Sequence, residues 1–143
     1  HAKTGEESRH NLLYWRYGDY LGLGPGAHGR LTLGDTKWAL RGHRSPDLWL
    51  SRVEEKGTGG HDPESVDRLS RLREAALMGM RIREGVPLAR LAAEYGGDPL
   101  TVIDPKKLRH LKEEGLIESS SDLLQATPQG LKCLNAVLGY LLG

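Results

Sequence analysis

A glycine-rich run near the beginning of the sequence constrains the local fold more tightly than any other feature. Residues 22–29 read Gly-Leu-Gly-Pro-Gly-Ala-His-Gly, so four of the eight are glycine. Proline and several glycines are unfavourable in a helix or a central strand, and residues 25–29 must therefore form a loop. The preceding residues 20–24, Tyr-Leu-Gly-Leu-Gly, are expected to form a short buried strand that leads into this loop.

The run matches neither of the common phosphate-binding glycine motifs. A dinucleotide fingerprint is followed by a helix, whereas alternating apolar residues on both sides of Gly34-Asp35 predict a β-hairpin here. A P-loop would end in Gly-Lys-Ser or Gly-Lys-Thr, and this run does not. Two interpretations remain: a ligand approaches the backbone of the loop closely, or the glycines supply positive φ angles at a tight corner.

The sequence changes character near residue 61. Before it, Ser45-Pro46 is typical of a helix start, and residues 56–60 read as a glycine-rich linker or wide turn. Glycines and aromatic residues are concentrated in this first part, whereas the second part is dominated by aliphatic residues at helical spacing. We therefore place a domain boundary at this point.

Residues 61–143 are predicted to form a helical domain. Two short strands are expected on either side of the polar residues 119–122. Four helices are expected, with starts marked by Asp62-Pro63, Pro87, Asp104-Pro105 and Thr127-Pro128. The order of three helices, a hairpin and a final helix is typical of a winged-helix domain. The predicted fold class of the whole chain is α+β and helix-rich.

The composition excludes several classes of protein. With 38% hydrophobic and 27% charged residues, the chain is neither a membrane protein nor a disordered tail. A formal net charge of +1 argues against a dedicated binder of polyanions. The single cysteine, Cys133, can form neither an intrachain disulfide nor, by itself, an iron–sulfur site. Together with the lack of a signal peptide, it indicates a cytoplasmic location.

Two histidines are candidate ligands. His10 stands beside Asn11, Tyr14 and Trp15. Imidazole binds metals and heme iron, and aromatic neighbours can stack on a flat macrocycle. His28, in the glycine-rich loop, is a candidate ligand or general acid–base group. Either histidine is equally compatible with a structural, hydrogen-bonded role.

The sequence shows no other catalytic pattern. No carboxylate pair, Ser-His-Asp arrangement or zinc-spaced cluster is present. The remaining histidines belong to no recognisable catalytic or metal-binding pattern in the sequence; they are His43, His61 and His110.

The third predicted helix of the second part carries a cluster of basic side chains. A recognition helix in a DNA major groove has this character, and so does an ordinary solvated helix face. Glu113 and Glu114 follow directly, which favours the solvated face. The basic residues are Lys106, Lys107, Arg109, His110 and Lys112.

The first part of the chain resembles a known family. Residues 10–15 read His-Asn-Leu-Leu-Tyr-Trp, and a Gly-x-Gly-x-Gly-Ala-His run follows at residues 22–28. This combination resembles the end of the catalytic barrel in radical S-adenosylmethionine proteins of the oxygen-independent coproporphyrinogen III oxidase family, closest to the heme-chaperone branch. Residues 74–85 resemble the segment that opens the family's C-terminal domain, and residues 115–130 resemble its winged-helix-like close.

The resemblance implies a fold and a set of site residues. Residues 1–60 would be the end of a partial (β/α) barrel, and residues 61–143 a winged-helix-like C-terminal domain. The heme-binding residues would be His10, Asn11, Tyr14 and Trp15. The loop facing the cofactor cavity would consist of Gly22, Gly24, Gly26, Ala27 and His28.

The resemblance also implies cofactors that this sequence cannot hold. The family binds an iron–sulfur cluster through a Cys-x-x-x-Cys-x-x-Cys motif, with S-adenosylmethionine on the cluster, and that motif is absent here. The chain is therefore expected to be a C-terminal piece of a longer protein. This piece is expected to bind no metal through its own side chains and not to be catalytic by itself. The cluster and S-adenosylmethionine would belong to the full-length parent.

The function implied is heme biosynthesis or heme delivery. The His-Asn-x-x-Tyr-Trp motif favours a heme chaperone over an oxidase, with heme or a porphyrin and heme-acceptor proteins as partners and no nucleic acid. The alternative from another class of protein is a winged-helix DNA-binding transcription regulator.

Overall fold

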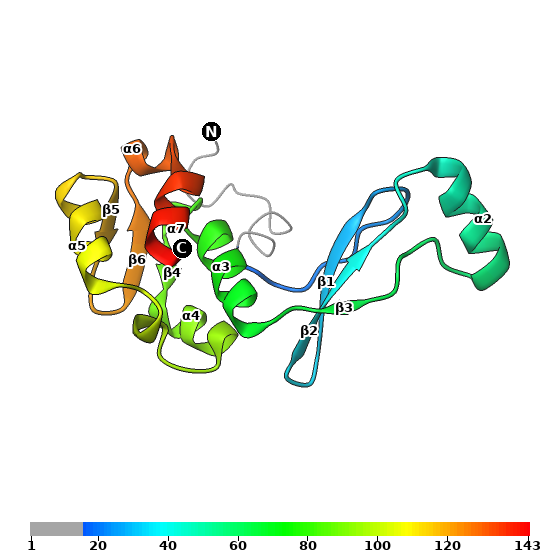
Figure 1. The fold of residues 1–143 in the computed structure, drawn as a ribbon, viewed down its shortest axis with the longest axis horizontal. Helices are drawn as coiled ribbons and strands as arrows, with labels where there is room; N and C mark the ends of the chain where they lie inside the picture. Colours follow the sequence, from blue (N-terminus) through cyan, green and yellow to red (C-terminus); the bar gives the residue numbers. More distant parts are fainter. Residues whose placement is uncertain (1–15) are drawn as a thin grey trace. The chain divides into compact units, whose positions relative to one another are not determined.

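The computed structural model describes residues 16–143 and divides them into two compact units (Figure 1). We call residues 18–67 the hairpin unit, and residues 16–17 together with 68–143 the helical unit. The described residues contain six α-helices and two three-stranded sheets, which confirms the mixed α+β class. None of the helices in these residues is long and apolar enough to cross a bilayer.

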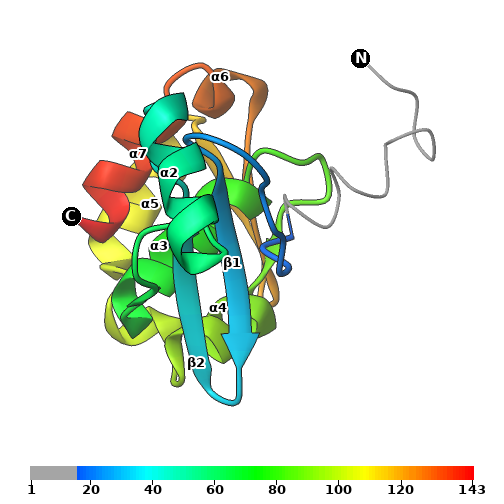
Figure 2. The ribbon, with the colours of Figure 1, turned by 90° about the vertical axis from the view of Figure 1, so that its right-hand side faces the viewer.

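The hairpin unit is built on two antiparallel strands, β1 (His28–Leu33) and β2 (Thr36–Arg41), joined by a tight turn (Figure 2). Gly34 in that turn has a φ of 61°, a conformation that glycine adopts without strain. A two-residue strand, β3 (Glu64–Ser65), pairs with the other edge of β2. The predicted hairpin is therefore confirmed.

The predicted helix after Ser45 is confirmed as α2 (Pro46–Lys56). Ser45 Oγ accepts a hydrogen bond from the Leu48 N–H at 3.4 Å, and Pro46 occupies the first turn. Gly57 ends the helix with a φ of 75°.

The buried strand predicted for residues 20–24 is wrong. Only Tyr20 pairs, through an isolated bridge to Arg30, and Leu21 and Leu23 are 66% and 95% exposed. The reason is that Gly24, with a φ of 94°, turns the chain before a ladder can form. The predicted loop is also shorter than expected, because β1 already begins at His28.

The helical unit contains the apolar core. All of the buried apolar side chains among the described residues lie in it, including Leu72, Leu91, Leu124 and Leu141, which are at most 2% exposed. In chain order, its elements are α3 (Arg68–Gly79), β4 (Val86–Pro87), α4 (Leu88–Tyr95), the 3-10 turn η1 (Pro99–Thr101), α5 (Pro105–Glu113), β5 (Ile117–Ser119), β6 (Leu123–Ala126), α6 (Pro128–Leu131) and α7 (Leu134–Leu142). The antiparallel sheet has the order β4-β6-β5.

Three of the four predicted helix starts in this unit are confirmed. Pro87, Asp104 and Thr127 each occupy the position before a helix, and the last two accept a backbone hydrogen bond through the side chain. The last predicted helix is interrupted, however, because the backbone at Cys133 leaves the helical conformation between α6 and α7.

The helix predicted to start at Asp62-Pro63 begins instead at Arg68. The intervening residues pair with β2: Ser65 lies opposite Trp38, and the Val66 N–H donates to the Lys37 carbonyl at 2.8 Å. Sheet pairing thus overrides the helical spacing of the apolar residues. The helix ends at Gly79, and the following residues lead into β4, which pairs with β6.

Candidate ligand site around the glycine loop

The predicted site residues fall into two groups. The heme-ligand candidates His10, Asn11, Tyr14 and Trp15 lie outside the described residues. The loop residues Gly22, Gly24, Gly26, Ala27 and His28 are described and lie in the hairpin unit.

The glycine loop is held against the segment that follows β2. The Gly26 N–H donates to the His43 carbonyl at 2.9 Å, and the Gly42 N–H donates to the Ala27 carbonyl at 2.8 Å. Gly24 and Gly26 have φ angles of 94° and 70°, which a larger residue would adopt only with strain. A Cβ atom on Gly42 would lie 2.6 Å from the Gly24 carbonyl oxygen. The glycines therefore serve a tight corner and a close backbone approach.

The same loop forms one wall of an open hollow of about 630 Å³. Four of the five predicted loop residues line it, and Gly26 does not. The other walls come from the end of β2, the inner side of α2 and residues 57–63. All of the lining residues belong to the hairpin unit, so the hollow is a property of that unit alone.

Cationic side chains dominate the hollow. Arg41, Arg52 and Lys56 line it, and Asp62 is the one acidic residue among its lining residues. Two further histidines, His43 and His61, also line it. The described walls therefore offer a cationic environment, in contrast to the near-neutral charge of the chain as a whole.

Two of the three imidazoles that line the hollow, those of His43 and His61, lie in contact with their rings tilted by 40°, which the sequence did not predict. The ring centroids of His43 and His61 are 3.8 Å apart. Each histidine follows a glycine, and Gly42 and Gly60 form an isolated antiparallel bridge that brings the two together. The repeated Gly-His dipeptide was the one sequence feature related to this histidine pair. It indicates the pair only once the bridge between Gly42 and Gly60 is known.

The surroundings of His43 disfavour its protonated form. Desolvation lowers the pKa of His43 below its usual value, and the nearby charges of His61, Arg52 and Arg41 lower the pKa further. A proton on His43 would therefore be repelled by these neighbouring charges, and an anion bound beside them would relieve that repulsion.

A second cluster anchors the chain directly after the predicted heme motif. Tyr17 is 2% exposed, has a φ of 59°, and donates a hydrogen bond to the Glu74 carboxylate on α3. Arg16 pairs with Glu84 at 2.7 Å, and Arg90 donates to the Arg16 carbonyl. Residues 16–17 are thereby fixed to the helical unit.

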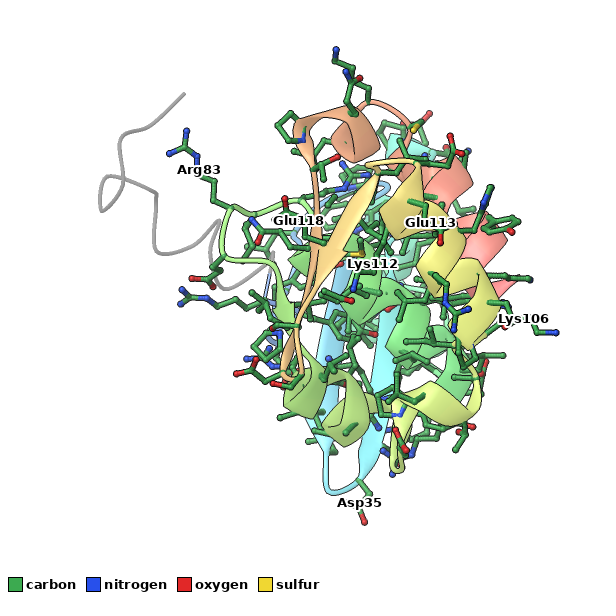
Figure 3. All side chains as sticks on the ribbon, turned by 90° about the vertical axis from the view of Figure 1, so that its left-hand side faces the viewer. Asp35, Arg83, Lys106, Lys112, Glu113 and Glu118 are labelled. Atoms are coloured by element: carbon green, nitrogen blue, oxygen red, sulfur yellow. The ribbon has the colours of Figure 1, made fainter. Side chains whose placement is uncertain are left out.

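The basic face of α5 lies on the surface of the helical unit (Figure 3). Lys106 extends from α5 into solvent, whereas the Lys112 ammonium donates a hydrogen bond to the Ser119 carbonyl on β5. Glu113 lies on the same helix and Glu118 on the neighbouring strand. The Lys107 ammonium lies 5.4 Å from the centre of the Tyr140 ring on α7. The face therefore mixes both signs of charge.

The described residues contain no group of three His, Cys, Asp or Glu side chains that could hold a metal ion. Cys133 is free and exposed. An iron–sulfur cluster therefore does not fit this part of the chain.

The sequence is similar to a family model and to several curated proteins. A family model described as the HemN C-terminal domain matches residues 66–132. The heme chaperone HemW of Bacillus subtilis is 36% identical over 142 residues, which cover 99% of this chain and 36% of that protein. The mitochondrial radical S-adenosyl methionine domain-containing protein 1 of Bos taurus is 33% identical, with 99% of this chain and 33% of that protein covered.

The fold is likewise similar to a solved structure. Coproporphyrinogen III oxidase (HemN) from Escherichia coli, described as a radical SAM enzyme, matches with a TM-score of 0.62 and 17% identity over 86% of this chain and 28% of that one. The chain spans about a third of the length of the curated relatives it matches.

Proposed function

This chain belongs to the HemN/HemW-like radical SAM proteins, and from that premise we propose that it binds heme and acts in heme delivery rather than in porphyrin oxidation. One observation carries the proposal. Proteins named as heme chaperones match 96–99% of this chain at 30–36% identity, and that span reaches into the region of the His10 motif. The match to the oxidase structure rests on 17% identity and supports the fold alone.

His10 is the heme-iron ligand in this proposal. Heme iron is commonly held by one axial imidazole, and Asn11, Tyr14 and Trp15 would orient that imidazole and stack on the macrocycle. Tyr17, two residues after Trp15 in the sequence, is anchored on Glu74 of α3. Heme-acceptor proteins would then be the partners that receive the cargo.

The cluster and S-adenosylmethionine belong, in this proposal, to parts of the whole protein that this sequence does not span. The sequence has one cysteine, whereas the family's cluster motif needs three. The chain alone would thus bind heme without cleaving S-adenosylmethionine. A cytoplasmic location is part of the same proposal and rests on cysteine usage.

We assign the two units to the two expected domains. The hairpin unit would be the end of a partial (β/α) barrel, and the helical unit a winged-helix-like domain. The second assignment is supported by the order α3-β4-α4-α5-β5-β6 and by the sheet order β4-β6-β5. In that arrangement α5 takes the position of a recognition helix.

The test is a heme titration of the 143-residue chain, followed by the Soret band. We expect a shifted Soret band in the original chain and its loss in His10→Ala. The control is His110→Ala, because His110 is an exposed histidine of the helical unit outside the proposed motif. An unchanged spectrum in His10→Ala, or equal losses in both variants, would remove His10 from this role.

The DNA-binding alternative rests on the position of α5 and its exposed basic residues Lys106, Arg109 and Lys112. Measuring DNA affinity at several salt concentrations separates the two functions. Phosphate contacts make affinity fall steeply with salt, so flat or absent binding ends this alternative. Glu113 and Glu118 on the same surface lead us to expect that result.

A further inference from the structure

We infer that the hollow of the hairpin unit is a subsite for the carboxylate groups of an anionic porphyrin, held by Arg41 and Arg52 beside the His43–His61 pair. The inference rests on the proposed function, which concerns the iron ligand His10. It adds a different set of residues that recognises a different part of the same class of molecule.

The charge of the hollow is the first argument. Arg41, Arg52 and Lys56 carry permanent positive charges, and Asp62 offsets only one of them. Guanidinium groups bind carboxylates through paired hydrogen bonds, and a surface of this composition selects anions over neutral ligands.

The apolar part of the hollow is the second argument. Leu21 and Leu23 line it while 66% and 95% exposed, and Trp49 and Val53 line it from α2. Exposed leucines beside arginines suit a ligand that is itself largely apolar and carries carboxylates at its edge. Heme and its biosynthetic precursors have this chemistry, with propionate arms around an apolar ring. A nucleic acid or free phosphate would gain nothing from the leucines.

The size and the backbone geometry are also suitable. A volume of about 630 Å³ lies within the range of roughly 300–1,000 Å³ for small-molecule sites. Gly59 allows Trp49 to lie against the backbone, since a Cβ atom there would come within 2.3 Å of the indole ring. Gly22 and Gly24 line the hollow through their backbone alone, between the side chains of Leu21 and Leu23.

An iron-free porphyrin tests the subsite without involving His10. Coproporphyrin, which carries four carboxylates, is titrated with the 143-residue chain and followed by its fluorescence anisotropy. Its methyl ester, which has the same ring without the charges, is the matched ligand. The variants are Arg41→Gln and Arg52→Gln, and the control is Arg83→Gln, which removes an exposed charge from the helical unit (Figure 3).

We expect each hollow variant to weaken coproporphyrin binding by roughly tenfold, the size of one charged hydrogen-bonded contact. Arg83→Gln should bind like the original chain. The ester should bind weakly, and equally in all variants. Circular dichroism confirms that each variant is folded. A perturbed His43 imidazole resonance on addition of coproporphyrin would locate the ligand in the hollow.

Three results would overturn the inference: no coproporphyrin binding to the original chain, equal binding by the hollow variants, or equal binding of acid and ester. Complete displacement of the porphyrin by millimolar inorganic phosphate would also overturn it, because the hollow would then be a general anion site. These outcomes are distinguishable from failure of the proposed function. Heme binding that depends on His10 but not on Arg41 or Arg52 rejects the subsite alone, whereas carboxylate-dependent coproporphyrin binding without a heme Soret shift rejects His10 alone.

Discussion

Gly130→Ala should strongly destabilise the helical unit, because no space exists for a side chain at this position. A Cβ atom on Gly130 would lie 1.8 Å from the Leu116 carbonyl oxygen, far inside van der Waals contact. The same oxygen accepts a hydrogen bond from the Thr127 N–H at 3.1 Å, and Thr127 Oγ1 accepts one from the Gly130 N–H at 3.1 Å. Moving Leu116 away would therefore also disturb the start of α6.

The magnitude follows from two contributions. Overpacking against a fixed neighbour typically costs about 1–3 kcal/mol. Weakening the hydrogen bond to Leu116 adds about 1 kcal/mol. The expected loss is thus roughly 2–4 kcal/mol, equivalent to a fall in Tm of about 10 °C or more for a domain of this size.

Gly139→Ala is the matched control on α7. A Cβ atom there would have nothing within 4 Å outside the helix's own backbone, and Gly139 is exposed. Replacing an exposed helical glycine by alanine stabilises a helix by about 0.5–1 kcal/mol, so the same substitution should have the opposite sign.

Urea unfolding followed by far-ultraviolet circular dichroism is the appropriate assay, because this signal comes from the helices themselves, whereas Trp38 and Trp49 belong to the hairpin unit. Equal stability of Gly130→Ala and the original chain would refute the argument. So would a loss of similar size in Gly139→Ala.

Three further predictions concern single contacts. Leu72→Ala should lower the free energy of unfolding by about 2–5 kcal/mol, because Leu72 is completely buried in the core; a loss below 1 kcal/mol in urea unfolding would contradict it. Arg16→Gln should raise the pKa of Glu84 in an NMR titration, because the hydrogen bond from Arg16 is the main cause that lowers it. Since that folded-state pKa is depressed, the small stabilisation from this exposed pair is present at neutral pH and is lost as the pH falls through it. His61→Gln should raise the pKa of His43 part of the way to its usual value, since desolvation, the larger cause, remains; an unchanged pKa would show that the two rings do not interact.

Local backbone chemistry made much of the helical unit predictable. Asp104-Pro105 and Thr127-Pro128 mark helix starts for two reasons. The side-chain oxygen accepts a hydrogen bond from a backbone N–H that has no partner within the helix, and the fixed φ angle of proline suits the first turn. The hairpin around Gly34 was equally visible, because strand alternation and a tight turn are local features. These predictions needed no knowledge of distant contacts.

Two of the errors in the prediction concern pairing between residues that are distant in the sequence. Val66 fits a helical pattern, yet the segment before it pairs with β2 and delays α3 to Arg68. Residues 20–24 look like a buried strand, yet only Tyr20 forms a bridge to β1, and Leu21 and Leu23 remain exposed. An apolar pattern states which side chains prefer burial, but not whether a partner covers them.

The candidate site shows the same division. The sequence by itself determined that the chain forms a loop from Pro25 onward, because the backbone restrictions of proline and glycine act locally; the structure shows that this loop ends where β1 begins at His28. Only the tertiary structure decided what the loop faces. The bridge between Gly42 and Gly60 brings His43 and His61 together from positions far apart in the chain, and α2 adds Arg52. The charge of a hollow is a sum over residues that the fold makes neighbours, and no local pattern contains that sum.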